Sequence, residues 1–395
     1  MRNLISAIAI LAAVCTADAG IVNLQPDEKG DRIAAVEDGK AAYLPATRVD
    51  IGSGNIGGGS CRYIRRASDG DLYVTGPGLG LFRSTDGGHQ WTKTPLNIEG
   101  IMMMSSFHIL RDDTFLIVFM PSRDSKVMML SRSTDRGETW KTAPMQLDLS
   151  PCKYVLSWNG DLIQLADGPL LLTLDMRIGL DSVHDDEGNV MPMQHRGSWL
   201  YVFRSEDGGR TWPQKSMLPG YGGEAHLLEL PSGKVLACLR KQRWWSLPGD
   251  PASNLEMKKG VGWNLHVDNG IVDAGVGCNL LKNMFVSESY DGGYTWVNEQ
   301  QVTDFKQCSG EMTYTSDGIL VLTYLHRYDG GPIADRSIRA RVSYDDGAIW
   351  EAEEYVLSNG ENYPGGIATA DGGIISMCPH RGQVQAVHWR PRPRR

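Results

Sequence analysis

The sequence predicts an all-β protein, a six-bladed β-propeller built from four-stranded antiparallel blades. Two interleaved patterns support this prediction. The first is the segment Ser-x-Asp-x-Gly-x-x-Trp, in which Asp and Gly favour a tight hairpin turn, since the carboxylate accepts backbone N–H groups and Gly takes positive φ. An alternating stretch such as "LYVFRS" predicts a strand that enters the turn. Five copies, called box segments below, span residues 84–91, 133–140, 205–212, 289–296 and 343–350.

The second pattern is a turn followed by an apolar strand, and it alternates with the box segments along the chain. It occurs as "ASDGDLYV", "LRDDTFLIVF", "LADGPLLLTL", "LPSGKVLACL", "TSDGILVLTY" and "TADGGIISM". Six such signals with five box segments indicate six repeating units, the last of them incomplete. A propeller closed by pairing its two chain ends fits this pattern and leaves no exposed sheet edge. We therefore expect residues 20–395 to form one propeller, with the segment after Gly20 completing the last blade.

The first residues have the features of a secretory signal. Arg2 precedes an apolar run, and a small-x-small site at 17–19 predicts cleavage before Gly20. Residues 1–19 are thus an expected signal peptide, and the mature protein is expected to be secreted or periplasmic. No later stretch approaches the roughly 20 apolar residues that a transmembrane helix needs. Six cysteines follow the predicted cleavage site. We interpret them mainly as buried small side chains, with one or two disulfides as the alternative.

Composition narrows the possible partners. A net charge of −8 and a pI near 5.6 argue against a nucleic-acid or anionic-membrane surface. No Cys-x-x-Cys pair or His/Cys cluster indicates a metal site, so neither a metal nor another cofactor is expected. The protein is expected to act as a monomer.

The repeat pattern resembles the Asp-box repeats of the sialidase superfamily, in which the boxes lie at the blade periphery, away from the active site. The segment "GGEAHLLELPSGKVLACLR" (222–240) resembles the family segment in which a Glu opens an inner strand and an Arg ends the next strand. The resemblance implies that Glu224 is the acidic partner of the nucleophile. It implies that Arg240 and Arg336 belong to an arginine triad that binds the substrate carboxylate, and that Tyr363 is the catalytic tyrosine.

Sialidase chemistry gives a reason for these residue types. A sialic acid carries a carboxylate on its anomeric carbon, which would repel a carboxylate nucleophile, and sialidases use a tyrosine instead. A phenol has a pKa near 10, so it needs a neighbouring base such as a Glu within hydrogen-bond reach. Arginine forks bind the sugar carboxylate through paired, charge-assisted hydrogen bonds.

The first blade departs from the family pattern. The family has an Arg-Ile-Pro segment there, whereas this chain has "CRYIRRASDGDLYV". Arg62 matches the first arginine of the triad best, and Arg65 or Arg66 could replace it. The family's acid/base Asp is missing from this blade. The long segment 175–199 could supply a replacement for this acid. Alternatively, the segment is a solvated acidic loop without a catalytic role. Its possible acid/base residues include Asp175, Asp181 and Asp185.

These observations predict a sialidase-like exo-glycosidase that releases sialic acid or a related acidic sugar from a glycan or glycoconjugate. Two alternatives remain open. One is a different glycoside hydrolase or a lyase on the same propeller, with another set of acids. The other is a carbohydrate-binding propeller without catalysis, which would keep the arginines and need no acid. Lys282, one blade before Arg336, is interpreted as structural.

Overall fold

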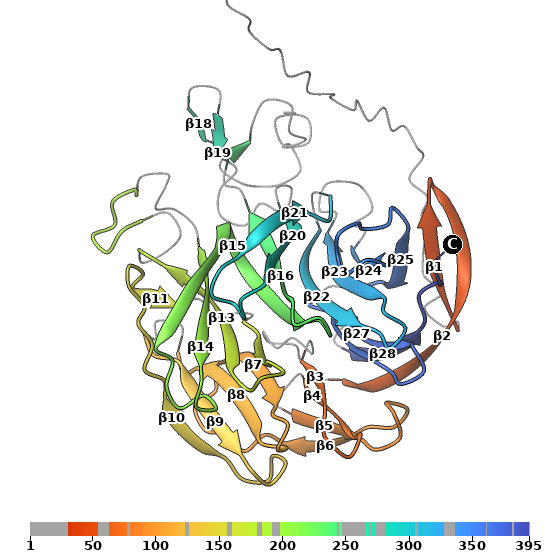
Figure 1. Ribbon diagram of the computed structural model, residues 1–395, viewed down its shortest axis with the longest axis horizontal. Coiled ribbons are helices and arrows are strands. Elements are labelled where there is room, and N and C mark those ends of the chain that lie inside the picture. Colours follow the sequence, from red (N-terminus) through yellow and green to blue (C-terminus); the bar gives the residue numbers. More distant parts are fainter. Residues whose placement is uncertain are drawn as a thin grey trace, which may run out of the picture.

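The chain is all-β in the computed structural model (Figure 1). The structure describes residues 31–53, 63–76, 80–122, 126–155, 160–179, 184–191, 198–242, 245–246, 266–268, 271–273, 282–304, 307–327, 336–360, 362–380 and 383–394. The predicted signal peptide at 1–19 lies outside these ranges. Within them, no helix is long and apolar enough to cross a membrane.

Two separate four-stranded antiparallel sheets follow one another in the first third of the described chain. Each is a simple meander, because every strand pairs with the next one along the sequence. The first sheet contains β3 (Ile64–Arg66), β4 (Leu72–Gly76), β5 (Gly80–Ser84) and β6 (Thr92–Pro95), and the second contains β7 (Met103–Ile109), β8 (Phe115–Met120), β9 (Met129–Ser133) and β10 (Lys141–Pro144).

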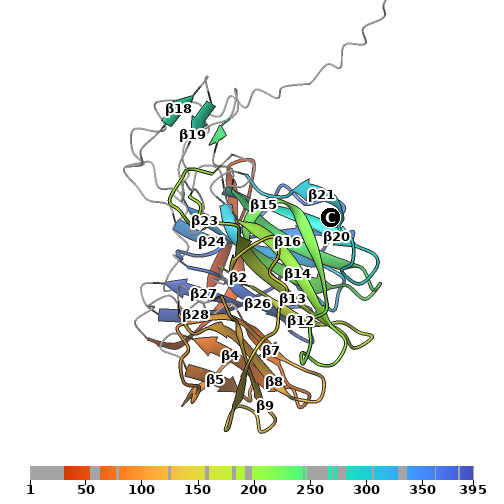
Figure 2. The same ribbon diagram turned by 90° about the vertical axis from the view of Figure 1, so that its left-hand side faces the viewer.

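An eight-stranded sheet follows, and the 16-residue strand β15 joins its two halves. The first part of β15 pairs with β14, and its last part pairs with β16. The strands are β11 (Tyr154–Val155), β12 (Leu162–Gln164), β13 (Leu170–Arg177), β14 (Trp199–Ser205), β15 (Gln214–Glu229), β16 (Val235–Gln242), β20 (Lys282–Ser289) and β21 (Val297–Gln301). A small three-stranded sheet contains β17 (Trp245–Ser246), β18 (His266–Asp268) and β19 (Ile271–Asp273); Figure 2 shows β18 and β19 projecting away from the large sheets.

The nine-stranded sheet contains both the first and the last strands of the described chain. Strand β2 pairs with β28, and β1 pairs with β25. In Figure 1 the red N-terminal strands accordingly lie beside the blue C-terminal strands. This is the pairing of chain ends that the repeat pattern predicts. The strands are β1 (Arg32–Glu37), β2 (Lys40–Ser53), β22 (Gln307–Tyr314), β23 (Leu320–Arg327), β24 (Arg336–Ser343), β25 (Glu354–Ser358), β26 (Gly365–Ala368), β27 (Ile374–His380) and β28 (Gln383–Trp389).

The architecture is a propeller of antiparallel sheets, but its number of continuous sheets differs from the prediction. The sequence predicts six blades, whereas the described residues form four sheets of four or more strands. The physical reason is that two of the connections between four-stranded groups are themselves hydrogen-bonded, so each of the two large sheets contains two such groups. Strand β15 passes from one four-stranded group into the next, and the β1–β2 hairpin links β25 to β28.

Apolar side chains fill the spaces between consecutive four-stranded groups. One buried cluster, for example, joins Phe107 and Phe115 of the second sheet to Tyr73 of the first. Another joins Leu200 and Val202 of β14 to residues of β16. Strands β4, β8, β13, β23 and β27 therefore have near-continuous buried faces, as the apolar runs in the sequence predict.

The five box segments share one turn geometry. In the third, the Ser205 hydroxyl donates to the Asp207 carboxylate at 2.8 Å, and the backbone N–H of Gly209 donates to Ser205 Oγ at 2.8 Å. The same Asp207 oxygen accepts the N–H groups of residues 210 and 211. Corresponding Ser–Asp and Gly–Ser hydrogen bonds occur in the other four. The box tryptophans are buried or half-buried, so these segments are structural turns.

Candidate active site

Seven strands, β13, β15, β16, β20, β22, β23 and β26, bring the candidate residues to one end of the propeller. In an antiparallel blade, the start of the inner strand, the end of the second strand and the start of the third lie at the same edge. Gly223 is accordingly paired with Arg240, and Gln242 with Lys282. The inner strands β15, β22 and β26 also contact one another in sequence. Side chains that are far apart in the chain therefore meet around Glu224.

Glu224 and Tyr363 form the centre of the site. The Tyr363 hydroxyl donates to Glu224 Oε1 at 2.7 Å. Arg240 Nη1 donates to the same oxygen, also at 2.7 Å. Glu224 is buried, and Tyr363 is half-buried immediately before β26. The structure thus brings together three residues that the family resemblance relates, a phenol, a carboxylate and a guanidinium.

The phenol of Tyr363 is neutral in this arrangement. Burial raises its pKa, the adjacent Glu224 carboxylate raises it further, and the Arg240 charge offsets only part of the increase. A tyrosine with a raised pKa cannot act as a nucleophile until a base takes its proton. Glu224 is placed to take it, because its Oε1 already accepts the phenolic hydrogen bond.

Ser309 holds the second oxygen of Glu224. Its hydroxyl donates to Glu224 Oε2 at 2.9 Å, and the side chain is buried. Ser309 lies on β22, the inner strand next to β15. Both carboxylate oxygens are consequently fixed by hydrogen bonds, and the one that faces Tyr363 is defined.

Asp175 lies on the other side of Arg240. A Cβ atom placed on Gly223 would lie 2.5 Å from Arg240 Nη2 and 2.8 Å from Asp175 Oδ2, so both groups approach this glycine closely. Burial raises the pKa of Asp175 to about 7, although the Arg177 charge and a Ser198 hydrogen bond oppose the shift. Asp175 Oδ1 has no hydrogen-bond partner within the described part of the chain. Asp175 is therefore a carboxyl group that can hold or release a proton near neutral pH.

Two further cations surround Glu224. Lys282 is 7% exposed, and burial together with the Arg240 charge lowers its pKa to about 8. Arg327 ends β23. Burial opposes its charge, but nearby groups that include Tyr363 and Glu224 outweigh this and raise its pKa. Neither side chain has an ion-pair partner among the described residues. Together with Arg240, they give the site more positive charge than Glu224 alone neutralises.

The predicted arginine triad is only partly assembled. Arg240 contacts Glu224, but Arg336 is exposed at the start of β24, directly opposite Arg327. The charges of Arg240 and Arg327 both act to lower the pKa of Tyr363. Arg62 lies outside the described residues. Its two alternatives are engaged elsewhere, since Arg65 is ion-paired with Asp161 and Arg66 donates to the backbone oxygen of Ala368.

The three acid candidates of segment 175–199 do not lie together. Asp175 joins the site, whereas Asp181 lies outside the described residues. Asp185 forms an exposed turn, in which its carboxylate accepts the backbone N–H groups of residues 187 and 189. Burial acts to raise the pKa of Asp185, but these and the Asn189 side-chain hydrogen bond lower it overall. For Asp185, the geometry agrees with the solvated-loop interpretation.

The cysteines of the described chain are not cross-linked. Those at 152, 238, 308 and 378 are buried, and none of them forms a disulfide. Cys61 and Cys278 lie outside the described residues, so a disulfide that involves them stays a prediction. Within the described ranges, no group of three His, Cys, Asp or Glu side chains is arranged to hold a metal ion.

Sequence reasoning missed Ser309 and Arg327 and interpreted Lys282 as structural. One positional signal was available. Asp175 and Arg240 both stand seven residues after a blade-turn glycine, at 168 and 233, so equivalent strand positions feed the site. Arg327 stands nine residues after Gly318, which is two residues farther along its strand than Asp175 and Arg240 are along theirs. For Ser309 we find no comparable signal, because its position depends on an irregularity in β22.

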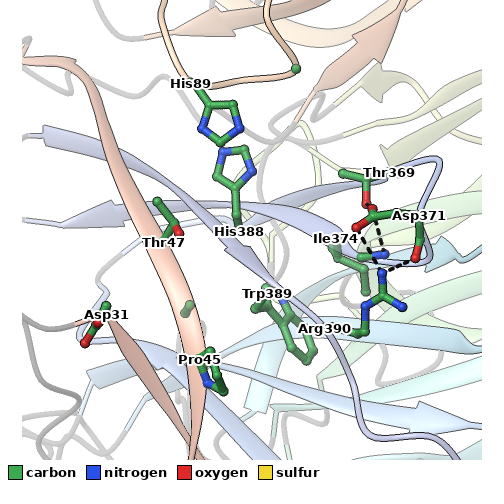
Figure 3. A pocket seen from close by; sticks show the side chains of 13 residues that line it. Asp31, Pro45, Thr47, His89, Thr369, Asp371, Ile374, His388, Trp389 and Arg390 are labelled. Atoms are coloured by element: carbon green, nitrogen blue, oxygen red, sulfur yellow. Dashed lines mark hydrogen bonds and ion pairs between the residues drawn. The ribbon is translucent and has the colours of Figure 1, made fainter.

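One cavity that the structure describes is separate from this site (Figure 3). It has a volume of about 600 Å³ and lies between β2, the first box segment, the β26–β27 turn and β28. The rings of His89 and His388 stack across it with centroids 4.7 Å apart. Arg390 on its wall is ion-paired with Asp371 at 2.9 Å. None of the residues around Glu224 lines this cavity.

Comparisons with known proteins identify the fold. No protein-family model matches the sequence, and no curated protein matches it. A Dyadobacter fermentans protein of unknown function has a similar structure, with a TM-score of 0.60 and 16% identity over 88% of this chain and 99% of that one. The GH93 α-L-arabinofuranosidase of Fusarium graminearum gives a TM-score of 0.56 and 14% identity over 91% and 98%. A Hadza microbial sialidase gives 0.54 and 16% over 84% and 65%. At these identities the comparisons show the propeller fold alone.

Proposed function

We propose that this protein is a secreted exo-glycosidase that hydrolyses terminal sialic acid or a related acidic sugar from glycans. The observation that carries the proposal is the shared oxygen of Glu224, which accepts hydrogen bonds from the Tyr363 hydroxyl and the Arg240 guanidinium. The structural neighbours support a glycosidase, since they include a sialidase and an arabinofuranosidase. The predicted signal peptide at 1–19 supports export.

We further infer that the propeller of residues 20–395 has six blades. The pairing registers divide the two large sheets into four four-stranded groups, with β2 as the fourth strand of the last one, and the two separate four-stranded sheets bring the number to six. The inner strands β3, β7, β12, β15, β22 and β26 contact one another in a closed ring. Six apolar clusters occupy the interfaces between neighbouring groups. Such a closed ring gives one axis, around which the site residues gather.

The proposed first step forms a glycosyl–tyrosine bond. Glu224 takes the proton of Tyr363, and the phenolate oxygen attacks the anomeric carbon as the bond to the leaving oxygen breaks. Asp175 donates a proton to that leaving oxygen, because a carboxyl group with a pKa of about 7 is partly protonated at neutral pH. Asp175 thereby takes the place of the acid that the first blade lacks.

The second step reverses these proton transfers. Asp175, now ionised, takes a proton from water as the water oxygen attacks the anomeric carbon and the bond to Tyr363 breaks. Glu224 returns its proton to the departing phenolate. Arg240 stabilises the ionised carboxylate of Glu224 when the phenol is neutral, since its Nη1 contacts the same oxygen. The cycle ends with both groups in their starting protonation states.

The surplus of cations supports an anionic sugar over a neutral one. Three cations, Arg240, Lys282 and Arg327, outnumber the two carboxyl groups of the site, Glu224 and the partly protonated Asp175, and a substrate carboxylate would balance them. The test is hydrolysis of two substrates with activated leaving groups, an aryl α-sialoside and an aryl α-L-arabinofuranoside. Cleavage of the sialoside supports the proposal, whereas cleavage of the arabinofuranoside alone assigns the site to neutral pentosides. Binding of sialic acid without cleavage of either substrate supports the carbohydrate-binding alternative.

We expect Arg327→Ala to weaken substrate binding more than Arg336→Ala. Arg327 is half-buried and its charge acts on Tyr363, while Arg336 is exposed and its charge is better screened by solvent. Loss of a charge-assisted hydrogen bond of about 1.5 to 3 kcal/mol corresponds to a rise in KM of roughly 10- to 100-fold. Steady-state kinetics and thermal melts of both variants measure the effect. A larger loss of substrate binding for Arg336→Ala would support the assignment of Arg336 to the carboxylate-binding triad, as the family resemblance implies.

Anion binding is expected to weaken as the pH rises through about 8. Lys282 has a pKa of about 8, so it is charged below this pH and neutral above it. The variant Lys282→Arg should bind with little change between pH 7 and 9, because arginine stays charged throughout. Calorimetric titration with sialic acid across this range compares the two proteins. Equal pH dependence in wild type and variant would exclude Lys282 from anion binding.

A further inference from the structure

Two facing strand irregularities build the centre of the site. The register of β15 shifts between Gly223 and Ala225, and that of β22 shifts between Cys308 and Glu311. Glu224 lies in the first irregularity and Ser309 in the second. Bulges of this kind re-aim a side chain relative to the regular alternation of a strand. Here they direct a carboxylate and a hydroxyl toward each other, 2.9 Å apart.

Both residues have backbone conformations that L-amino acids seldom adopt. Glu224 has φ of 67° and Ser309 has φ of 59°, and neither is glycine. Such left-handed residues cost conformational free energy and persist only where the surrounding structure enforces them. A glycine at either position would relieve this cost, but it would remove the side chain. Both positions nevertheless carry a side chain, and the two side chains are hydrogen-bonded to each other.

A buried cluster of charged and polar side chains lies two residues farther along the same two strands. His226, two residues after Glu224, lies 3.3 Å from Asp161 and 3.2 Å from Glu311, which stands two residues after Ser309. Arg65 joins the same two carboxylates, at 2.9 and 3.5 Å. Three of the four residues are buried, and Arg65 is largely covered.

The cluster fixes the relative position of β15 and β22. The backbone N–H of Met312 donates to His226 Nδ1 at 3.2 Å, so the ring proton lies on Nε2, which faces the two carboxylates. The backbone N–H of Leu227 donates to Asp161 as well. Because these bonds cross between blades, the two strands cannot slide past each other without breaking buried charged contacts.

We propose that Ser309 is a positioning residue, which holds Glu224 Oε2 so that Oε1 faces the Tyr363 hydroxyl, and that the Arg65–Asp161–His226–Glu311 cluster holds Ser309 and Glu224 in this arrangement. The inference rests on the proposed function in one respect, since it takes Glu224 as the base for Tyr363. Ser309 acts through Glu224 and is not assigned any contact with substrate.

The experiment compares Ser309→Gly and Ser309→Ala with wild type. Glycine relieves the left-handed strain and alanine keeps it, but both remove the hydroxyl. We expect Ser309→Gly to melt at or above the wild-type temperature and still lose at least tenfold in kcat on an activated sialoside, with KM changed less than threefold. The acid limb of its kcat–pH profile should move to higher pH, because loss of a hydrogen bond to a carboxylate favours its protonated form.

Asp38→Gly is the matched control. Asp38 has φ of 49° in the exposed turn between β1 and β2, so glycine should relieve the same kind of strain without any change in kcat or pH profile. Unchanged kcat and pH profile in Ser309→Gly, with an active wild type, would overturn the positioning role and leave the proposed function intact. An inactive wild type would instead contradict the proposed function. In that case, a crystal structure of Ser309→Gly still tests the positioning role. A Tyr363–Glu224 hydrogen bond kept at 2.7 Å would show that Ser309 does not position Glu224.

Discussion

Tyr363→Phe should reduce hydrolysis of an activated sialoside by at least 1,000-fold while affinity for sialic acid stays within about threefold. The substitution removes only the phenolic oxygen, which is the proposed nucleophile and the donor to Glu224. Loss of a covalent nucleophile typically costs several orders of magnitude in kcat, because the remaining groups supply binding and electrostatic stabilisation only. Stopped-assay kinetics with the aryl sialoside measure kcat, and calorimetry with free sialic acid measures affinity.

Tyr344→Phe is the matched control for this variant. Its hydroxyl donates to the backbone oxygen of Arg392, and Tyr344 lies in the box segment that follows β24, in a different sheet from Glu224. We expect it to keep wild-type kinetics. If Tyr363→Phe retained more than a tenth of wild-type kcat, tyrosine would not be the nucleophile. Direct attack of water on the anomeric carbon would then be the simpler mechanism.

The repeat spacing made most of the fold predictable from the sequence. Box segments and turn–strand signals recur at regular intervals, and each predicts local hydrogen bonds that the Ser205–Asp207 turn illustrates. Pairing of the chain ends follows from the unit count, and β2 pairs with β28 accordingly. The continuity of β15 across two blades was not predictable, because the segment "QKSMLPGYGGEAHLLE" contains the proline and glycines that usually separate strands.

The site was predictable only where the family resemblance supplied a residue. Tyr363, Glu224 and Arg240 were named from the family resemblance, and in the structure Tyr363 and Arg240 both donate hydrogen bonds to Glu224. Ser309 depends on a bulge with a left-handed residue, and no local pattern in "QCSGEMTY" specifies one. The perturbed protonation of Asp175 depends on burial by groups from other strands, which a single sequence does not reveal. The cluster around Arg65 is non-local for the same reason.

Asp175→Asn should separate the proposed acid from the proposed nucleophile. General acid catalysis contributes roughly 100- to 10,000-fold when the leaving group is a poor one. We therefore expect a loss of this size on a sialyl-disaccharide, whose leaving sugar needs a proton. Loss on an aryl sialoside should be less than tenfold in the first step, since an aryl oxide leaves without protonation. The ratio of the two kcat/KM values measures the effect.

The pH dependence of the same variant gives an independent check. The pKa of Asp175 is raised from 3.8 to about 7, so disaccharide cleavage by the wild type should decline as the pH rises through about 7. The raised value also means that the fold favours the protonated carboxyl. Its contribution to stability is fully present below pH 3.8 and is lost as the pH rises through 7. Asp175→Asn should therefore melt at a higher temperature relative to wild type at pH 8 than at pH 4.

Asp185→Asn provides the control, because it removes a carboxylate from the same segment but from an exposed turn whose two backbone hydrogen bonds to Oδ1 asparagine can retain. It should change neither the substrate ratio nor the pH profile. Equal losses of Asp175→Asn on both substrates would assign Asp175 to the support of Arg240 and not to proton transfer. That outcome would leave the leaving group to be protonated by another residue, with Tyr363 and Glu224 still carrying the attack on the anomeric carbon.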